Sequence, residues 1–258
     1  FQQYERLLEK YFSYCERIHW YSYELMRTQC DFLMTSLLTN DCLERGRSIL
    51  KGGVRYLGGT DETYGNINAS DSLAAIKKVV FDEGRYTLRA VVDATNANFE
   101  GYEALRHDLL AAPKYGNDDD YADDIAVRLH EFICRTVRKT GEEVGFHNYG
   151  TVLINNQVNT EWGRKTGASH DGRLCRMFMN NGNNPQSGAD HNGPTAMLNS
   201  LVKLDVNDHA GSVQNIKFTH DMFVSKMPVL RALIKTYFEN GGCQVMVSVM
   251  DPGQPEHA

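Results

Sequence analysis

The chain has 258 residues, of which 41% are hydrophobic, and a formal net charge of −6 at pH 7. This length and apolar content suffice for one large domain or two small ones with a real core. The acidic balance and the scattered basic residues argue against a nucleic-acid surface. No stretch of the sequence resembles a signal peptide or a transmembrane span.

The six cysteines are scattered and form no CxxC pair. This pattern favours free thiols in a reducing cytoplasm over a disulfide framework or a zinc site. The chain begins without Met inside a helical pattern and stops at "DPGQPEHA" soon after an apolar run. We therefore interpret it as a piece of a longer protein.

The first 140 residues are predicted to be rich in helices. Apolar and aromatic side chains recur at helical spacing over residues 1–28, and a second helix is predicted over 31–46, ended by Gly46. A Gly-rich stretch with one short strand near 54–57 follows. Further helices are predicted over 70–83 (capped by Ser70 or Asp71), 87–96, 100–111 and 120–140, the last with Arg138 and Lys139 in its final turn.

The pattern changes after Gly145. Residues 149–155 form a short apolar run that predicts a buried strand. A Gly- and Asn-rich loop then fills 157–194, and loops longer than about 12–15 residues are usually functional or disordered. A helix from 194, a strand over 211–218, a helix over 227–240 and a strand over 243–249 complete the chain.

Helices that alternate with short, continuously apolar strands predict an α/β protein with a parallel sheet or barrel. We interpret residues 1–258 as one partial barrel domain, with a helix-rich part at 1–140 and a part with the strands and the long loop at 145–258. The two parts lack a linker and are expected to depend on each other.

Several familiar sites are absent from the sequence. Residues 117–124 hold five aspartates but lack the alternating ligands and closing Glu of an EF-hand loop, so we expect helix capping and no metal. A metal hydrolase that uses this cluster is the alternative, and it requires bound metal at 117–124. The HExxH, GxGxxG, P-loop and GxSxG motifs are all missing from the sequence, which argues against the corresponding enzymes.

Polar side chains surround the strand predicted at 149–155. Ligands of α/β proteins bind at the carboxyl ends of strands. The sequence therefore makes four residues candidates to line a substrate pocket, although asparagines at strand ends can also serve only to satisfy loop backbone. These candidates are His147, Tyr149, Asn155 and Asn156.

The long loop also carries a family resemblance. The segments "KTGASHDGR" and "NGNNPQSGADHNGPTAMLNSLVKLD" resemble the T-G-A/N-x-x-D-G-R and G-x-D-x-x-G-x-T/V-A segments of glycyl radical enzymes, the pyruvate formate-lyase and diol dehydratase superfamily. Other stretches agree in the same order over roughly residues 30–250. They are "DCLERGRSILKGGVRY", "DSLAAIKKVVFDE", "PKYGNDDDYAD" and "YFENGGCQVMVSV".

The resemblance implies a ten-stranded α/β barrel built from two half-barrels, of which this chain supplies most of the second. It implies a radical lyase, dehydratase, decarboxylase or formate C-acyltransferase that stores an unpaired electron on a glycine and passes it to a cysteine. We infer that the long loop is ordered and seals the barrel, because such chemistry needs a closed site. The parent would be a cytoplasmic enzyme of anaerobic metabolism, commonly a homodimer, and its radical would be installed by an S-adenosylmethionine radical iron–sulfur activase.

The family's catalytic cysteine lies upstream of the K-G-G segment and its radical glycine lies in an R-V-x-G-Y/F-like loop near the C-terminus. Cys42 matches a non-catalytic position, and neither Cys15 nor Gly253 has the expected neighbours. We therefore expect no catalytic residue, no bound cofactor and no activity in this isolated chain. The alternative is a complete, non-catalytic half-barrel that serves as a scaffold or partner subunit. We favour a fragment, because a half-barrel needs a mate to cover its open edges.

Overall fold

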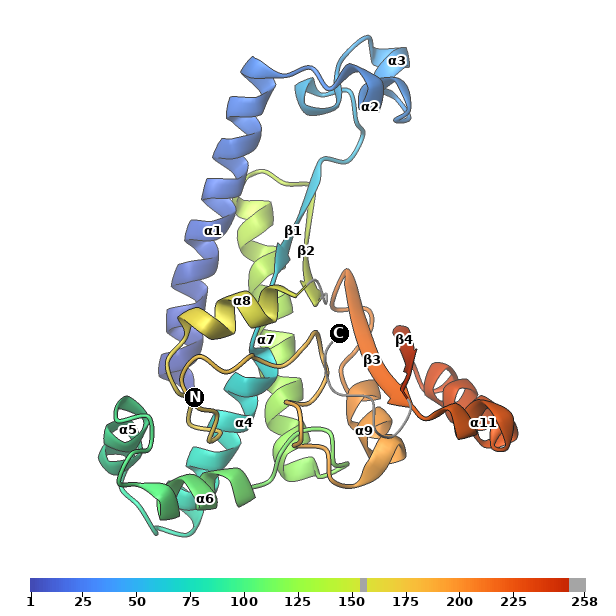
Figure 1. Cartoon of the computed structure of the whole chain (residues 1–258). Helices are drawn as coiled ribbons and strands as arrows, with labels where there is room; N and C mark the ends of the chain where they lie inside the picture. The colour runs from blue at the N-terminus through green and yellow to red at the C-terminus, as the bar shows by residue number, and fades with distance from the viewer. Residues whose placement is uncertain (154–156, 251–258) are drawn as a thin grey trace. The chain divides into compact units, whose positions relative to one another are not determined.

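The computed structural model describes residues 1–153 and 157–250 (Figure 1). The chain forms two compact units that are interleaved in sequence. Unit 1 comprises Phe1–Glu62 and Phe132–Val152, and unit 2 comprises Thr63–Glu131 and Leu153–Ala258. This division differs from the helix-rich and strand-containing parts described from the sequence, because the long helix α7 (Asp120–Val144) contributes to both units.

Unit 1 pairs two parallel strands, β1 and β2, with Gly58 opposite Asn148. The predicted helix over 1–28 is confirmed. The single helix predicted over 31–46 is wrong, because left-handed backbone at Phe32 and Asp41 divides this stretch into two short helices. The unit contains α1 (Gln2–Gln29), α2 (Leu33–Leu37), α3 (Cys42–Arg45), the 3-10 turn Ile49–Lys51, β1 (Gly58–Glu62), the C-terminal part of α7 and β2 (Asn148–Leu153).

Unit 2 pairs β3 with β4, again in parallel, with Val213 opposite Gln244. Its helices are α4 (Asn66–Ile76, continued by a π-helical turn, Lys77–Asp82), α5 (Leu88–Asn96), α6 (Glu103–Ala111), α8 (Val158–Lys165), α9 (Gly193–Val202), α10 (His220–Val224) and α11 (Met227–Glu239), with the first turns of α7. Its strands are β3 (Gly211–Phe218) and β4 (Gln244–Val249).

Three predictions for these elements are corrected. Helix α4 begins at Asn66, so Ser70 and Asp71 lie inside it and do not cap it. Helix α7 continues to Val144, so the basic residues near 138 are not in its last turn. Helix α8 occupies part of the predicted loop, which leaves a shorter Gly/Asn loop (residues 166–192).

The core of unit 2 determines which side chains of β3 are buried. Its Ile216 and Phe218 side chains are buried among apolar residues of α9 and α11, including Leu198 and Leu230. Burying each such side chain contributes roughly 1.5–3 kcal/mol. Because side chains alternate along a strand, Val213, Asn215 and Lys217 face the opposite side. That side of β3 is free to line a cavity.

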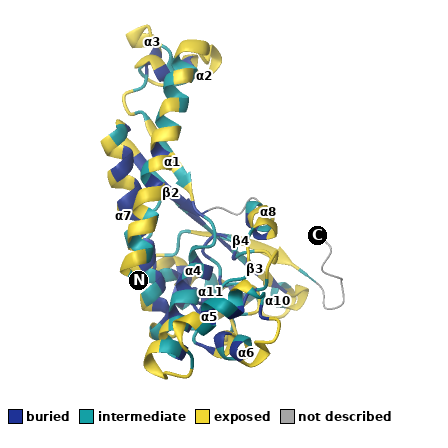
Figure 2. Ribbon diagram, turned by 90° about the vertical axis from the view of Figure 1, so that its left-hand side faces the viewer, coloured by how far each residue is buried: buried dark blue, intermediate teal, exposed yellow. Residues whose placement is uncertain are grey.

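A second apolar cluster joins α4, α5 and α6, with Val79, Val91 and Leu109 fully buried. Figure 2 shows buried residues along β2 and many exposed residues over α2 and α3. All six cysteines are free thiols, as predicted. Within the described part of the chain, no helix combines the length and the apolar character that a membrane span requires.

Candidate functional site

A polar cavity of about 730 Å³ lies in unit 2, between β3 and the Gly/Asn loop. Its volume falls in the range of roughly 300–1,000 Å³ that is common for small-molecule sites. Most of the polar groups that line it are side-chain amides, joined by one cation and one carboxylate. These residues are Asn159, Asn180, Asn181, Asn184, Asp190, Asn215 and Lys217.

Asn184 attaches the Gly/Asn loop to the strand. Its Nδ2 donates to the carbonyl oxygen of Asn215 at 2.6 Å, and its Oδ1 accepts from the Asn215 amide at 3.0 Å. One side chain thus makes the two hydrogen bonds that a neighbouring strand would make. The loop follows the edge of β3 because of this pairing, and it forms one wall of the cavity.

Two further asparagines form hydrogen bonds with the Gly/Asn loop at Met179 and Asn180. The Nδ2 group of Asn159 in α8 donates to the Met179 carbonyl at 3.0 Å, and the Met179 amide donates back to the Asn159 carbonyl at 3.3 Å. The Asn180 amide donates to Oδ1 of the buried Asn68 in α4 at 2.7 Å. Buried amides that bond backbone in this way satisfy polar groups that water no longer reaches.

Asn117 fixes the other end of the loop. Its Oδ1 accepts from the amides of His191 and Asn192 at 2.7 and 3.1 Å, and its Nδ2 donates to the Ala189 carbonyl at 2.8 Å. Side chains from α4, from α8 and from the segment before α7 thus bond the Gly/Asn loop. These bonds fit the ordered loop that the family resemblance implies.

The aspartate cluster at 117–124 bonds to a lysine of the protein. The Lys203 ammonium group lies 2.7 Å from Oδ2 of Asp123, 2.8 Å from Oδ1 of Asp120 and 3.1 Å from Oδ1 of Asp118. Asp123 is fully buried and also accepts from the Ser200 hydroxyl at 2.8 Å. These contacts join α7 to α9 and give the carboxylates a structural role.

Tyr149, a predicted pocket residue, is buried in unit 1. Its hydroxyl lies 2.8 Å from Nδ1 of His19, and its ring packs against Phe146. Added Cβ atoms at Gly59 and Gly141 would lie 2.6 and 2.2 Å from its side chain, so both glycines permit this packing. Burial, and then the nearby carboxyl groups, raise the pKa of the Tyr149 hydroxyl.

His147 is exposed and stacks on Tyr56, with ring centroids 4.5 Å apart. Asn155 and Asn156 lie outside the described residues. The residues that line the unit 2 cavity come from other segments, so the four pocket candidates remain predictions. Asn184 and Asn215 were not among the predicted site residues, although the asparagine-rich "NGNN" and the "VQNIK" strand pattern offered a signal for them.

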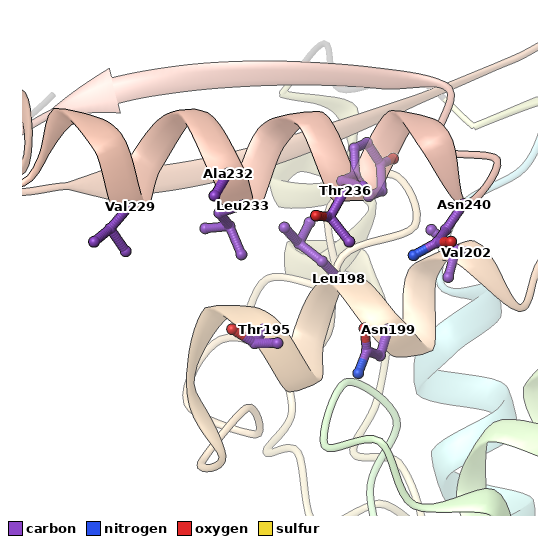
Figure 3. A pocket seen from close by; sticks show the side chains of 10 residues that line it. Thr195, Leu198, Asn199, Val202, Val229, Ala232, Leu233, Thr236 and Asn240 are labelled. Atoms are coloured by element: carbon purple, nitrogen blue, oxygen red, sulfur yellow. The ribbon is translucent and has the colours of Figure 1, made fainter.

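An apolar groove of about 240 Å³ separates α9 from α11. Figure 3 shows Leu198 of α9 and Leu233 of α11 pointing into it, with Thr195 and Thr236 nearby. The side chains that line the groove are apolar or neutral. It therefore offers less chemistry to a polar substrate than the cavity beside β3.

Comparison with known proteins identifies the family. The family model described as pyruvate formate lyase-like matches residues 1–160, and the model described as glycine radical matches residues 179–258. The chain belongs to the glycyl radical enzyme superfamily. The expected absence of the glycine radical segment is therefore not confirmed, and Gly253, near the end of this match, lies outside the described residues.

The relatives include trans-4-hydroxy-L-proline dehydratase of Clostridioides difficile, which is 33% identical over 84% of this chain and 28% of its own length. Isethionate sulfite-lyase of Bilophila wadsworthia (strain 3_1_6) is 34% identical over 72% of this chain and 22% of its own length. The chain thus spans about a quarter of the length of these relatives.

The solved structure of the glycerol-bound, B12-independent glycerol dehydratase from Clostridium butyricum superposes with a TM-score of 0.77 and 34% identity. The match covers 82% of this chain and 27% of that protein. The chain is therefore part of the α/β barrel of glycyl radical enzymes, as the sequence predicted. Its parallel strand pairs agree with that barrel.

Proposed function

We propose that the chain is a piece of a glycyl radical enzyme that acts on a small organic substrate as a radical lyase, dehydratase, decarboxylase or formate C-acyltransferase. The observation that supports this most is the likeness to two dehydratases of the family over more than four fifths of the chain. Because the chain spans only 27–28% of those proteins, we assign the activity to a longer parent polypeptide.

The role we assign to this chain is to form part of the wall of the substrate chamber. Asn184 and Asn215 hold the Gly/Asn loop against β3, while Lys217 and Asp190 offer charged groups to the cavity. In the parent, the radical would pass from a glycine to a cysteine, and the cysteine radical would take a hydrogen atom from the substrate. The ordered loop supports this chemistry by excluding water and stray hydrogen donors.

We also propose that His147, Tyr149, Asn155 and Asn156 face the substrate space of the parent. Replacing Tyr149 by Phe or Asn156 by Ala in the parent is expected to change substrate affinity and to leave radical formation intact. The measurement is KM together with the yield of the radical. Unchanged kinetics in both variants would remove these residues from the site.

The isolated chain is proposed to be inactive and to bind no cofactor. The parent would acquire its radical from an S-adenosylmethionine radical iron–sulfur activase and would work as a homodimer. The match to the glycine radical family supports a radical-bearing parent. A cytoplasmic, anaerobic setting is proposed from the family and from the scattered free thiols.

Electron paramagnetic resonance tests this proposal. The parent polypeptide and the 258-residue chain are each incubated without oxygen with activase and S-adenosylmethionine, and spectra are recorded. We expect a glycine-centred doublet from the parent and none from the chain alone. A doublet from the chain would refute its inactivity, and a parent that yields neither radical nor turnover would refute the proposed enzyme.

A further inference from the structure

A second cavity in unit 2, of about 360 Å³, lies between α4, α6 and the Gly/Asn loop, and shares only Ser187 and Gly188 of its lining with the cavity beside β3. Its charged lining consists of Asp71, Arg106, Lys114, Asp171 and Arg173. Three cations and two carboxyl groups thus surround a space large enough for a small molecule. Its hydrogen-bonding groups show which kind of molecule fits.

Most of the charged groups already have partners inside the protein. Lys114 is buried, and its three N–H groups can all be used by the carbonyl oxygens of Leu109, Leu110 and Ala112. Asp171 accepts from the Ser169 hydroxyl, the Arg173 amide and Nδ2 of Asn68. These groups contribute charge to the cavity, but they have little hydrogen-bonding capacity left for a ligand.

The groups of the cavity that can still form hydrogen bonds are mainly the N–H donors of two arginines. Arg106 donates through Nε to the Gly172 carbonyl at 2.9 Å, and within the described residues no protein group bonds its two Nη atoms. Arg173 uses four of its five N–H groups, on Ser169 and on three carbonyl oxygens, which leaves one. A planar guanidinium with free Nη groups matches the two oxygens of a carboxylate.

Asp71, a buried carboxyl group with one oxygen that lacks a hydrogen-bond partner in the described part of the chain, lines the same cavity. Its side chain is 1% exposed, and its Oδ1 accepts from the Tyr115 amide at 2.9 Å. Its Oδ2 has no hydrogen-bond partner among the described residues. Burial raises the pKa of this carboxyl, with Asp171 and Asp123 adding to the shift and the Tyr115 amide and Lys114 opposing it. Because Oδ2 is closed off from solvent, Asp71 forms part of the wall of the cavity and makes no direct contact with a ligand.

We propose that this cavity binds the carboxylate of a small organic acid, held by Arg106 and the remaining N–H of Arg173. Leu110, Leu174 and Met177 also line the cavity, and they give the ligand's carbon chain an apolar surface. The charged side chains of this site do not line the cavity beside β3, and the proposal does not rest on the enzymatic function proposed above.

Isothermal titration calorimetry of the parent polypeptide with sodium butyrate tests the site at pH 6.5. We expect butyrate to bind at least several-fold more tightly than acetate or inorganic phosphate, because only butyrate fills the apolar part. Arg106→Gln should weaken binding at least tenfold. Arg89→Gln, which alters an exposed arginine paired with Asp93 on α5, is the control and should change it less than twofold.

A further variant keeps the test independent of folding defects. Leu110→Trp, at a half-exposed position, should block the cavity while leaving both arginines intact. The proposal would be overturned if butyrate did not bind, or if its binding survived both Arg106→Gln and Leu110→Trp. It would also be overturned if phosphate bound as tightly as butyrate.

Discussion

Replacing Lys203 by Met removes the only cation that the structure places directly against the buried carboxylate of Asp123, within the described residues. The Asp123 side chain is fully buried, and burial raises its pKa, while Lys203 and Ser200 oppose that shift. Breaking a buried ion pair by removing one partner typically costs about 3–5 kcal/mol. Lys203 is 27% exposed, so we expect a loss near the lower limit, about 3 kcal/mol.

The other two carboxylates around Lys203 matter less to this figure. Asp118 and Asp120 are 41% and 81% exposed, and exposed pairs contribute about 0–1 kcal/mol each. The cost of Lys203→Met is thus assigned mainly to Asp123. Asp123→Asn in the same chain should recover most of the lost stability, because a neutral amide is far less costly to bury than an unpaired charge.

Urea denaturation followed by circular dichroism at pH 7 measures the four members of this double-mutant cycle. We expect a coupling energy of about 2 kcal/mol between the two positions. Lys235→Met, which removes an exposed pair with Glu239, is the matched control and should change stability by less than about 0.5 kcal/mol. A cost below about 0.5 kcal/mol for Lys203→Met, or an equal cost with and without Asp123, would refute the reasoning.

Two other predictions concern single side chains. Glu16 is fully buried, and burial first, then Asp61, raises its pKa to about 7, so the folded chain should lose stability as pH rises from about 4.5 to 7. Glu16→Gln should then be more stable than the natural chain by about 2–3 kcal/mol at pH 8 and by little at pH 4. Urea titrations at the two pH values measure this difference, and a variant that is less stable than the natural chain at pH 8 would contradict the prediction. Asn184→Ala removes two hydrogen bonds to Asn215, worth about 1 kcal/mol each, so hydrogen exchange at the Asn215 amide should accelerate about 30-fold. Unchanged exchange would show that the loop is held elsewhere.

The sequence predicted best those elements whose pattern is local. Strand β3 and helix α5 were predicted within one residue of their observed ends, because apolar runs and turn residues bound them. Strand β1 was predicted near 54–57 but lies at 58–62, in the segment "GGTDE", which has little strand propensity. That strand is defined by its pairing with β2, a contact about 90 residues away in sequence that no local pattern reveals.

The candidate site could be predicted only in part. The loop's length and the family resemblance predicted that the Gly/Asn loop is ordered and seals the barrel, but the pocket itself was predicted around residues 147–156. The architecture of the site depends on pairs such as Asn68 with Asn180, which are 112 residues apart, and Asn117 with His191, 74 apart. An isolated asparagine is equally compatible with a turn, a cap or a loop anchor. The roles of these asparagines therefore depend on the folded structure and could not be predicted from the sequence.

The central claim is that these 258 residues belong to a longer glycyl radical enzyme. The intact mass of the native polypeptide, measured from its source, tests it most directly. We predict a mass far above the 29.2 kDa of this chain, in a polypeptide that also contains the catalytic cysteine loop. A native mass near 29.2 kDa would contradict the account and would favour a non-catalytic half-barrel that works with a partner chain.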